Sequence, residues 1–141
     1  MISTFSQLRV IHLAFVLAWF MYLWLLIYLH SPEKPVPIIF PMALGIVAIS
    51  SIQLCHTLRQ KLLFAPAAAL VSDPENAVLL RQWRAGNIVS FAFAESVMLF
   101  GVILKFLGER WSIVSIFFGI GLLLLLLWSP KKSQTLPPGA R

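Results

Sequence analysis

The apolar stretch at residues 85–107 constrains this chain more than any other feature, because it carries one carboxylate near its middle. The stretch, AGNIVSFAFAESVMLFGVILKFL, is long enough to cross a hydrocarbon core of about 30 Å as a helix. A helix rises about 1.5 Å per residue, so Glu95 is expected roughly 15 Å into the span, near the membrane midplane. A charged carboxyl group without a partner is costly there, so we expect Glu95 to be neutral, paired or functional.

The composition predicts a membrane protein. Of the 141 residues, 60% are hydrophobic and 11% are charged, and a soluble domain carries about twice that share of charge. Lipid must therefore solvate part of the apolar surface. The net charge of +6 is interpreted as a topology signal, and nothing else in the sequence favours a nucleic-acid partner. Cys55 is the single cysteine and cannot form an intrachain disulfide.

Four membrane-spanning helices are predicted, joined by a proline-rich turn at 32–37 and a short turn at 108–110. We expect a single domain, residues 1–141, with an all-α fold: an integral membrane four-helix bundle of two antiparallel hairpins. The first apolar run is assigned to the bundle rather than to a cleaved signal, because no small-residue cleavage site follows it. The predicted spans are residues 10–29, 36–58, 85–107 and 111–128.

Basic residues predict the orientation. Lys34, Lys105 and Arg110 fall on one side of the predicted bilayer, near Glu33 and Glu109. More basic residues fall on the other side and mark it as cytoplasmic, with both termini there and the protein in the inner (cytoplasmic) membrane. These residues are Arg9, Arg59, Lys61, Arg81, Arg84, Lys131, Lys132 and Arg141.

The segment 59–84 is predicted to be a cytoplasmic loop with a helix start inside it. Ser72 and Glu75 form a capping-box pattern around Pro74, so a helix is expected to begin near Asp73 and to run unbroken into the third span. The basic character of this loop predicts contact with anionic lipid or with a partner protein. The tail, 129–141, is rich in proline and is predicted to be disordered.

Two interpretations of Glu95 remain open from the residues alone. In one, a protonated carboxyl group bonds to a neighbouring helix, with Ser50, Ser51 or Ser96 as candidate partners at similar depth. In the other, Glu95 takes up and releases a proton during function. Intramembrane ionisable residues favour a functional role by default.

Small residues surround Glu95 at helical spacing. Gly86, Ser90 and Ala94 are four residues apart, and Gly101 follows Ala94 after seven. Small side chains let helix backbones approach closely. We expect close contact with another helix of this chain, and self-association is the alternative.

His12 and His56 are expected at one depth in neighbouring spans, where they are either haem ligands of the b type or interface residues. The chain offers too few ligands for a metal site, so apart from that haem alternative no cofactor is expected. Hydrolase, zinc-protease, redox and phosphate-loop motifs are absent from the sequence, so no catalytic residue and no enzymatic activity are predicted.

Residues 92–104, AFAESVMLFGVIL, resemble the carboxylate-bearing helix of the rotary ATP synthase c subunit. The shared features are a Glu after small residues and an apolar stretch that contains Phe100-Gly101. The resemblance implies that Glu95 carries protons in a ring of identical subunits. The chain departs from that family in its additional spans, its longer loop and its second span, where Gly45 is the sole glycine. As a whole it is similar to small four-helix bacterial membrane proteins.

Three functions remain in view. The first is a non-enzymatic accessory or interaction subunit of the inner membrane, in contact with lipid and with a membrane-protein partner or further copies of itself. The second is a proton carrier similar to the c subunit, using Glu95. The third is a b-haem electron-transfer subunit, using His12 and His56.

Overall fold

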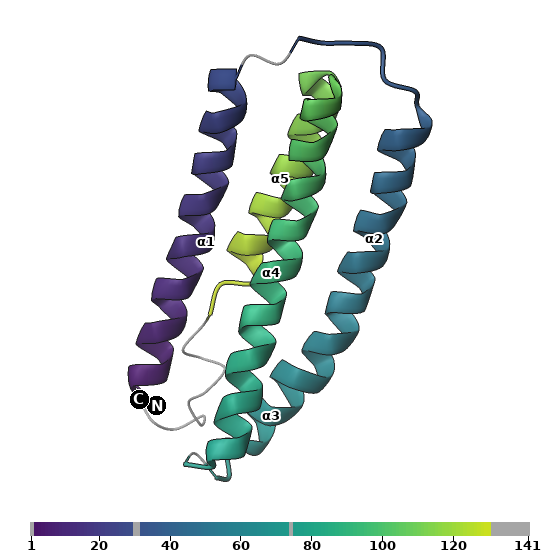
Figure 1. Ribbon diagram of the computed structural model, residues 1–141. Coiled ribbons are helices and arrows are strands. Elements are labelled where there is room, and N and C mark those ends of the chain that lie inside the picture. Colours follow the sequence, from purple (N-terminus) through teal and green to yellow (C-terminus); the bar gives the residue numbers. More distant parts are fainter. Residues whose placement is uncertain (1, 30–31, 74, 131–141) are drawn as a thin grey trace.

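The computed structural model describes residues 2–29, 32–73 and 75–130, and every regular element in these residues is a helix (Figure 1). The predicted all-α fold with four long helices is confirmed. The predicted tail lies outside the described residues from position 131 onward. The helices are α1 (Ile2–Leu29), α2 (Ile39–Arg59), the π-helical turn η1 (Gln60–Phe64), α3 (Ala65–Ala69), α4 (Ala77–Leu107) and α5 (Trp111–Leu127).

Helix α4 is the centre of the bundle. It contacts α1, α2 and α5, and α1 also contacts α5. The α4–α5 pair is a closely packed antiparallel hairpin, as predicted from its short turn. In contrast, α1 and α2 run antiparallel but lie on opposite sides of α4 (Figure 1), so the first predicted hairpin is not a packed pair of helices.

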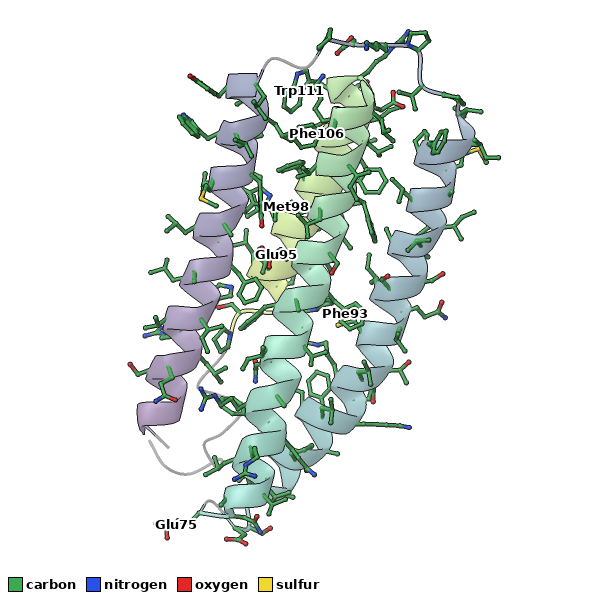
Figure 2. All side chains as sticks on the ribbon, in the orientation of Figure 1. Glu75, Phe93, Glu95, Met98, Phe106 and Trp111 are labelled. Atoms are coloured by element: carbon green, nitrogen blue, oxygen red, sulfur yellow. The ribbon has the colours of Figure 1, made fainter. Side chains whose placement is uncertain are left out.

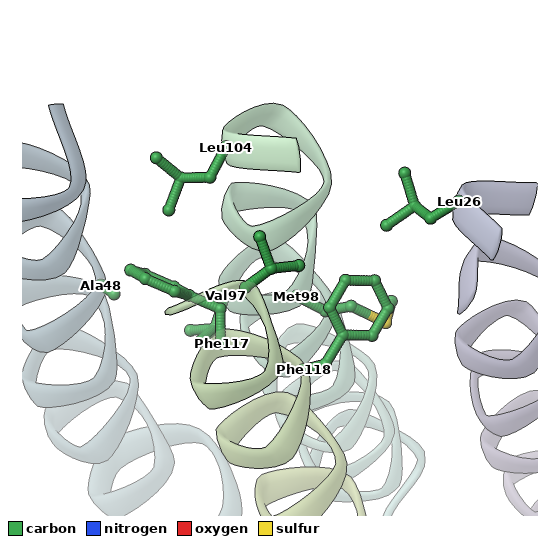
Figure 3. Close-up of a cluster of buried hydrophobic side chains, with 8 residues drawn as sticks. Leu26, Ala48, Val97, Met98, Leu104, Phe117 and Phe118 are labelled. Atoms are coloured by element: carbon green, nitrogen blue, oxygen red, sulfur yellow. The ribbon is translucent and has the colours of Figure 1, made fainter. Parts of the chain in front are cut away.

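One apolar cluster joins all four long helices (Figure 3). It draws on the inner faces of α4 and α5, and α1 and α2 each add one buried side chain from opposite sides. The cluster therefore fastens the two outer helices to the central pair. Its members are Leu26, Ala48, Val97, Met98, Leu104, Val114, Phe117 and Phe118.

Three helical segments are long and apolar enough to cross a membrane: 6–29, 39–69 and 77–107. The fourth apolar helix, α5, is shorter, with 17 residues. In the apolar part of each segment, only 6% of the residues of α1 and 11% of those of the segment that begins with α2 are buried, against 44% for α4. The outer faces of α1 and α2 thus leave large apolar side chains exposed, which suits a chain solvated by lipid.

The predicted loop at 59–84 is mostly helical, and its predicted capping box is wrong. The hydroxyl of Ser72 donates to the carbonyl of Ala69 (2.8 Å) and does not cap α4. The first turn of α4 is capped by Asn76, whose side-chain oxygen accepts from the backbone N–H groups of Val78 (3.1 Å) and Leu79 (3.2 Å). The expectation of one unbroken helix into the third span is confirmed, since α4 has 31 residues.

Helix α2 does not end at the predicted boundary, because η1 and α3 continue it to Ala69. Pro66 has no N–H to donate to the carbonyl of Leu62, so the normal helical hydrogen bond is lost there. The backbone compensates with a π-turn, in which the N–H of Ala65 donates to the carbonyl of Gln60.

The π-turn rests directly on α4 at Gly86. A Cβ atom added to Gly86 would lie 2.8 Å from the carbonyl oxygen of Leu62, so this contact is between backbones. Gly101 makes a similar contact inside the α4–α5 hairpin, where an added Cβ would lie 3.0 Å from the Cβ of Phe117. These two glycines set the distance of α4 from its neighbours on either side.

The close contact at Gly86 can be tested by adding one methyl group. Gly86→Ala should lower the free energy of unfolding in detergent by about 1–3 kcal/mol, because backbone atoms must move apart. Gly45→Ala is the matched control, since an added Cβ there meets no atom within 4 Å and alanine favours a helix by about 1 kcal/mol. Equal effects of the two changes would contradict the contact.

Candidate functional site

Glu95 lies in the middle of α4, partly buried, on the side of the helix that faces α1 (Figure 2). Phe93, two residues earlier, lies on the side that faces α2. Helix geometry accounts for this difference, because two residues turn a helix by about 200°. The carboxyl group therefore occupies the edge between α4 and α1, neither sealed in the core nor on the outermost surface.

Aromatic and sulfur side chains from α4 border Glu95 on its α1 side. One turn earlier, the Phe91 ring contacts the rings of His12 (centroids 5.1 Å apart) and Phe15 (5.8 Å). Three residues later, Met98 is fully buried in the apolar cluster. The surroundings of the carboxyl group are thus apolar along α4 in both directions.

The candidate partners do not meet Glu95. Ser50 and Ser51 belong to α2, on the opposite side of α4. The hydroxyl of Ser96 donates to the carbonyl of Ala92 (2.8 Å) within α4 itself. Across the residues that the structure describes, no hydrogen bond or ion pair reaches the Glu95 carboxyl group. Its stabilisation in a membrane must therefore come from a proton or from another molecule.

The four small residues near Glu95 are all buried. Gly86 meets η1, Gly101 meets α5, and Ala94 meets α5 at Gly121, where an added Cβ would lie 3.1 Å from the Ala94 carbonyl oxygen. The hydroxyl of Ser90 donates to the Gly86 carbonyl (2.7 Å) and needs no other partner. This stripe is therefore occupied by contacts within the chain.

The two candidate haem ligands are not brought together. His12 is on α1 and donates from its Nε2 to the carbonyl of Leu125 in α5 (2.9 Å). His56 is on α2, exposed, with its Nε2 3.4 Å from the Nε2 of Gln60. Helix α4 lies between α1 and α2. No group of three or more potential metal-ligating side chains occurs among the described residues.

Two side-chain hydrogen bonds attach α1 to α5, a role that the sequence did not reveal. Besides His12, the indole N–H of Trp19 donates to the carbonyl of Phe118 (3.0 Å). The two donors are seven residues apart, and so are the two carbonyls that accept from them. Spacing by seven keeps both bonds on one side of each helix.

Each end of the bundle holds a buried basic residue. At the end near the start of α1, the guanidinium of Arg59 lies over the ring of Trp128 (4.8 Å to the centroid). At the other end, the ammonium of Lys105 lies over the ring of Trp111 (4.8 Å) and donates to the carbonyl of Glu109 (3.2 Å). The sequence indicated interface positions for these residues but not their burial against tryptophan.

No family model, curated protein or solved structure matches this chain. The resemblance of residues 92–104 to the c subunit of ATP synthase therefore stays a prediction that rests on those residues alone.

The attachment of α1 can be tested at Trp19. Trp19→Phe removes the indole donor and should lower the free energy of unfolding in detergent by about 1 kcal/mol, the usual net contribution of one hydrogen bond. Trp24→Phe is the matched control, because the Trp24 side chain is 63% exposed. A loss of stability as large in the control would show that ring size, not the hydrogen bond, is responsible.

Proposed function

We propose that this chain is a non-enzymatic, multi-pass protein of the inner (cytoplasmic) membrane that acts as an accessory or interaction subunit. The observation that carries the proposal is the partly exposed carboxyl group of Glu95, which has no partner among the described residues. In lipid, such a group is stabilised when another membrane helix donates a hydrogen bond to it or pairs with its charge. A partner protein or a further copy of the chain supplies that helix.

The surface beside Glu95 supports close approach of a second helix. On α4, Ala92 and Leu99 are exposed one turn before and one turn after the carboxyl group, and Ser96 is partly buried with its hydroxyl already satisfied. Small or apolar side chains of this kind let helix backbones approach in a membrane. The incoming helix would therefore meet one polar group, Glu95, on an otherwise apolar face.

The chain also offers a basic surface that can attach to lipid headgroups, at the end of the bundle where α4 begins. Arg81 and Arg84 line a shallow surface pocket together with Leu80 and Ala77. Basic side chains beside apolar ones attract anionic lipid headgroups at a membrane surface.

Site-specific photo-crosslinking in cells tests the proposed interaction. A photoreactive amino acid at Leu99, which is 36% exposed, should trap a defined protein adduct. The adduct should persist with Glu95→Gln, which keeps the hydrogen-bonding shape, and should fall about fivefold or more with Glu95→Leu, since an intramembrane hydrogen bond contributes about 1–2 kcal/mol.

The matched control places the same photoreactive group at Ile46 of α2, which is 63% exposed and remote from Glu95. Any adduct formed there should not respond to Glu95→Leu. An adduct at Leu99 that is equally strong with Glu95→Leu would contradict the proposal, as would trapping of lipid alone.

The second candidate function is the proton carrier similar to the c subunit. It is favoured by the partial exposure of Glu95, because a carrier must reach both lipid and an aqueous channel during its cycle. Placement of His12 and His56 on either side of α4 does not favour the haem alternative. A proton carrier of this type would also require a closed ring of copies.

Labelling by a hydrophobic carbodiimide separates the two candidates. The reagent reacts with protonated carboxyl groups that it can reach from lipid, so labelling of a titrating carrier falls as the pH rises. Labelling of Glu95 with this pH dependence in a ring-sized assembly would overturn the interaction proposal in favour of the carrier. We expect a small assembly whose labelling is suppressed by the bound partner, with Glu95→Gln as the unlabelled control.

A further inference from the structure

A cavity of about 270 Å³ opens at the end of the bundle remote from the start of α1. Its walls come from the connection before α2, from the first turn of α2 and from the turn between α4 and α5. This volume equals that of roughly nine water molecules, so a small polar group fits inside. Glu95 lies near the middle of α4, away from this end of the molecule, so the cavity is not part of the site around Glu95.

The wall of the cavity is anchored at the α4–α5 turn. The backbone N–H of Lys34 donates to the carbonyl of Gly108 (2.9 Å). Gly108 has a φ of 99°, which favours glycine, and an added Cβ would lie 3.0 Å from the Lys34 backbone nitrogen. The carboxylate of Glu33 accepts from the backbone N–H of Trp111 (3.4 Å) and lies 3.9 Å from the Lys105 ammonium. The connection is thus held in place from two sides.

Two cations and one carboxylate line the polar part of the cavity. Lys34 and Arg110 are exposed, and neither side-chain cation has a partner among the described residues. Glu109 is buried, and its Oε1 accepts from the backbone N–H of Arg110 (3.0 Å). Helices α2 and α5 both begin here, and their N-terminal ends add partial positive charge.

The rest of the lining is apolar and leads into the membrane-facing surface. Ile38, Pro41 and Ile113 line the cavity below its charged rim, and Ile38 is 72% exposed. Trp111 stands at the same end, in the interface position that indole rings prefer. A ligand that fits both parts has a charged head and an apolar tail, as a membrane lipid has.

We propose that this cavity binds the headgroup of a glycerophospholipid with a primary amine, of the phosphatidylethanolamine class. Its phosphate lies between Lys34 and Arg110, and its ammonium group donates to the Glu109 carboxylate. Its acyl chains run along Ile38, Pro41 and Ile113 outside the cavity. The carboxylate disfavours a purely anionic headgroup, and a choline headgroup has no N–H to donate to it.

Native mass spectrometry of the full chain in detergent, with equimolar mixtures of phosphatidylethanolamine, phosphatidylcholine and phosphatidylglycerol of matched acyl chains, tests the proposal. The wild-type chain should retain phosphatidylethanolamine about tenfold more strongly than phosphatidylcholine. The double variant Lys34→Gln/Arg110→Gln should lose this retention. Glu109→Gln keeps the oxygen that accepts from Arg110, and should lose the preference over phosphatidylcholine while still binding phospholipid.

The matched control is Arg81→Gln/Arg84→Gln, which removes the same charge from the shallow pocket at the opposite end of the bundle. It should leave the preference for phosphatidylethanolamine over phosphatidylcholine unchanged. Equal retention of phosphatidylethanolamine and phosphatidylcholine by the wild-type chain, stronger retention of phosphatidylglycerol than of phosphatidylethanolamine by Arg81→Gln/Arg84→Gln, or a preference that survives in Lys34→Gln/Arg110→Gln would each overturn the proposal. Circular dichroism of each variant verifies that its helices are folded. The comparison of phosphatidylethanolamine with phosphatidylcholine on the wild-type chain tests the proposal without any variant.

Discussion

The structure depends on the close contact of α4 with every other long helix. Gly86 and Gly101 bring backbone and side-chain atoms of η1 and α5 to within about 3 Å of where a Cβ would stand. In a membrane, lipid competes for apolar surfaces, so close packing and hydrogen bonds hold helices together. Among the described residues, α1 and α2 have no such contact with each other: α4 positions α2, and α4 and α5 together position α1.

The polar groups of the bundle divide into two kinds. Ser90, His12 and Trp19 donate hydrogen bonds within the chain. The Ser90 bond lies within α4, and the other two attach α1 to α5. The side-chain charged groups of Glu95, Lys34 and Arg110 make no hydrogen bond or ion pair among the described residues. The first kind supports the fold, and the second kind is available to molecules outside it.

Much of the fold follows from the sequence, because apolar length and turn residues act locally. The α4–α5 hairpin was predictable from the turn at Gly108, and the apolar part of α4 from the run at 85–107. The start of α4 was not, since Asn76 competes with Ser72 for the role of cap and sequence spacing favours the wrong one. The side of α4 that carries Glu95, and the separation of His12 from His56, depend on which helices touch, and no local pattern specifies that.

The segment from Ile39 to Ala69 and helix α4 each contain 31 residues, or roughly 46 Å of helix, about 16 Å more than a hydrocarbon core. Where η1 meets Gly86, the two excess lengths are joined backbone to backbone. They form one helical end of the molecule that is continuous with α2 and α4. A change at this contact therefore reaches both helices, since η1 continues α2 and Gly86 belongs to α4.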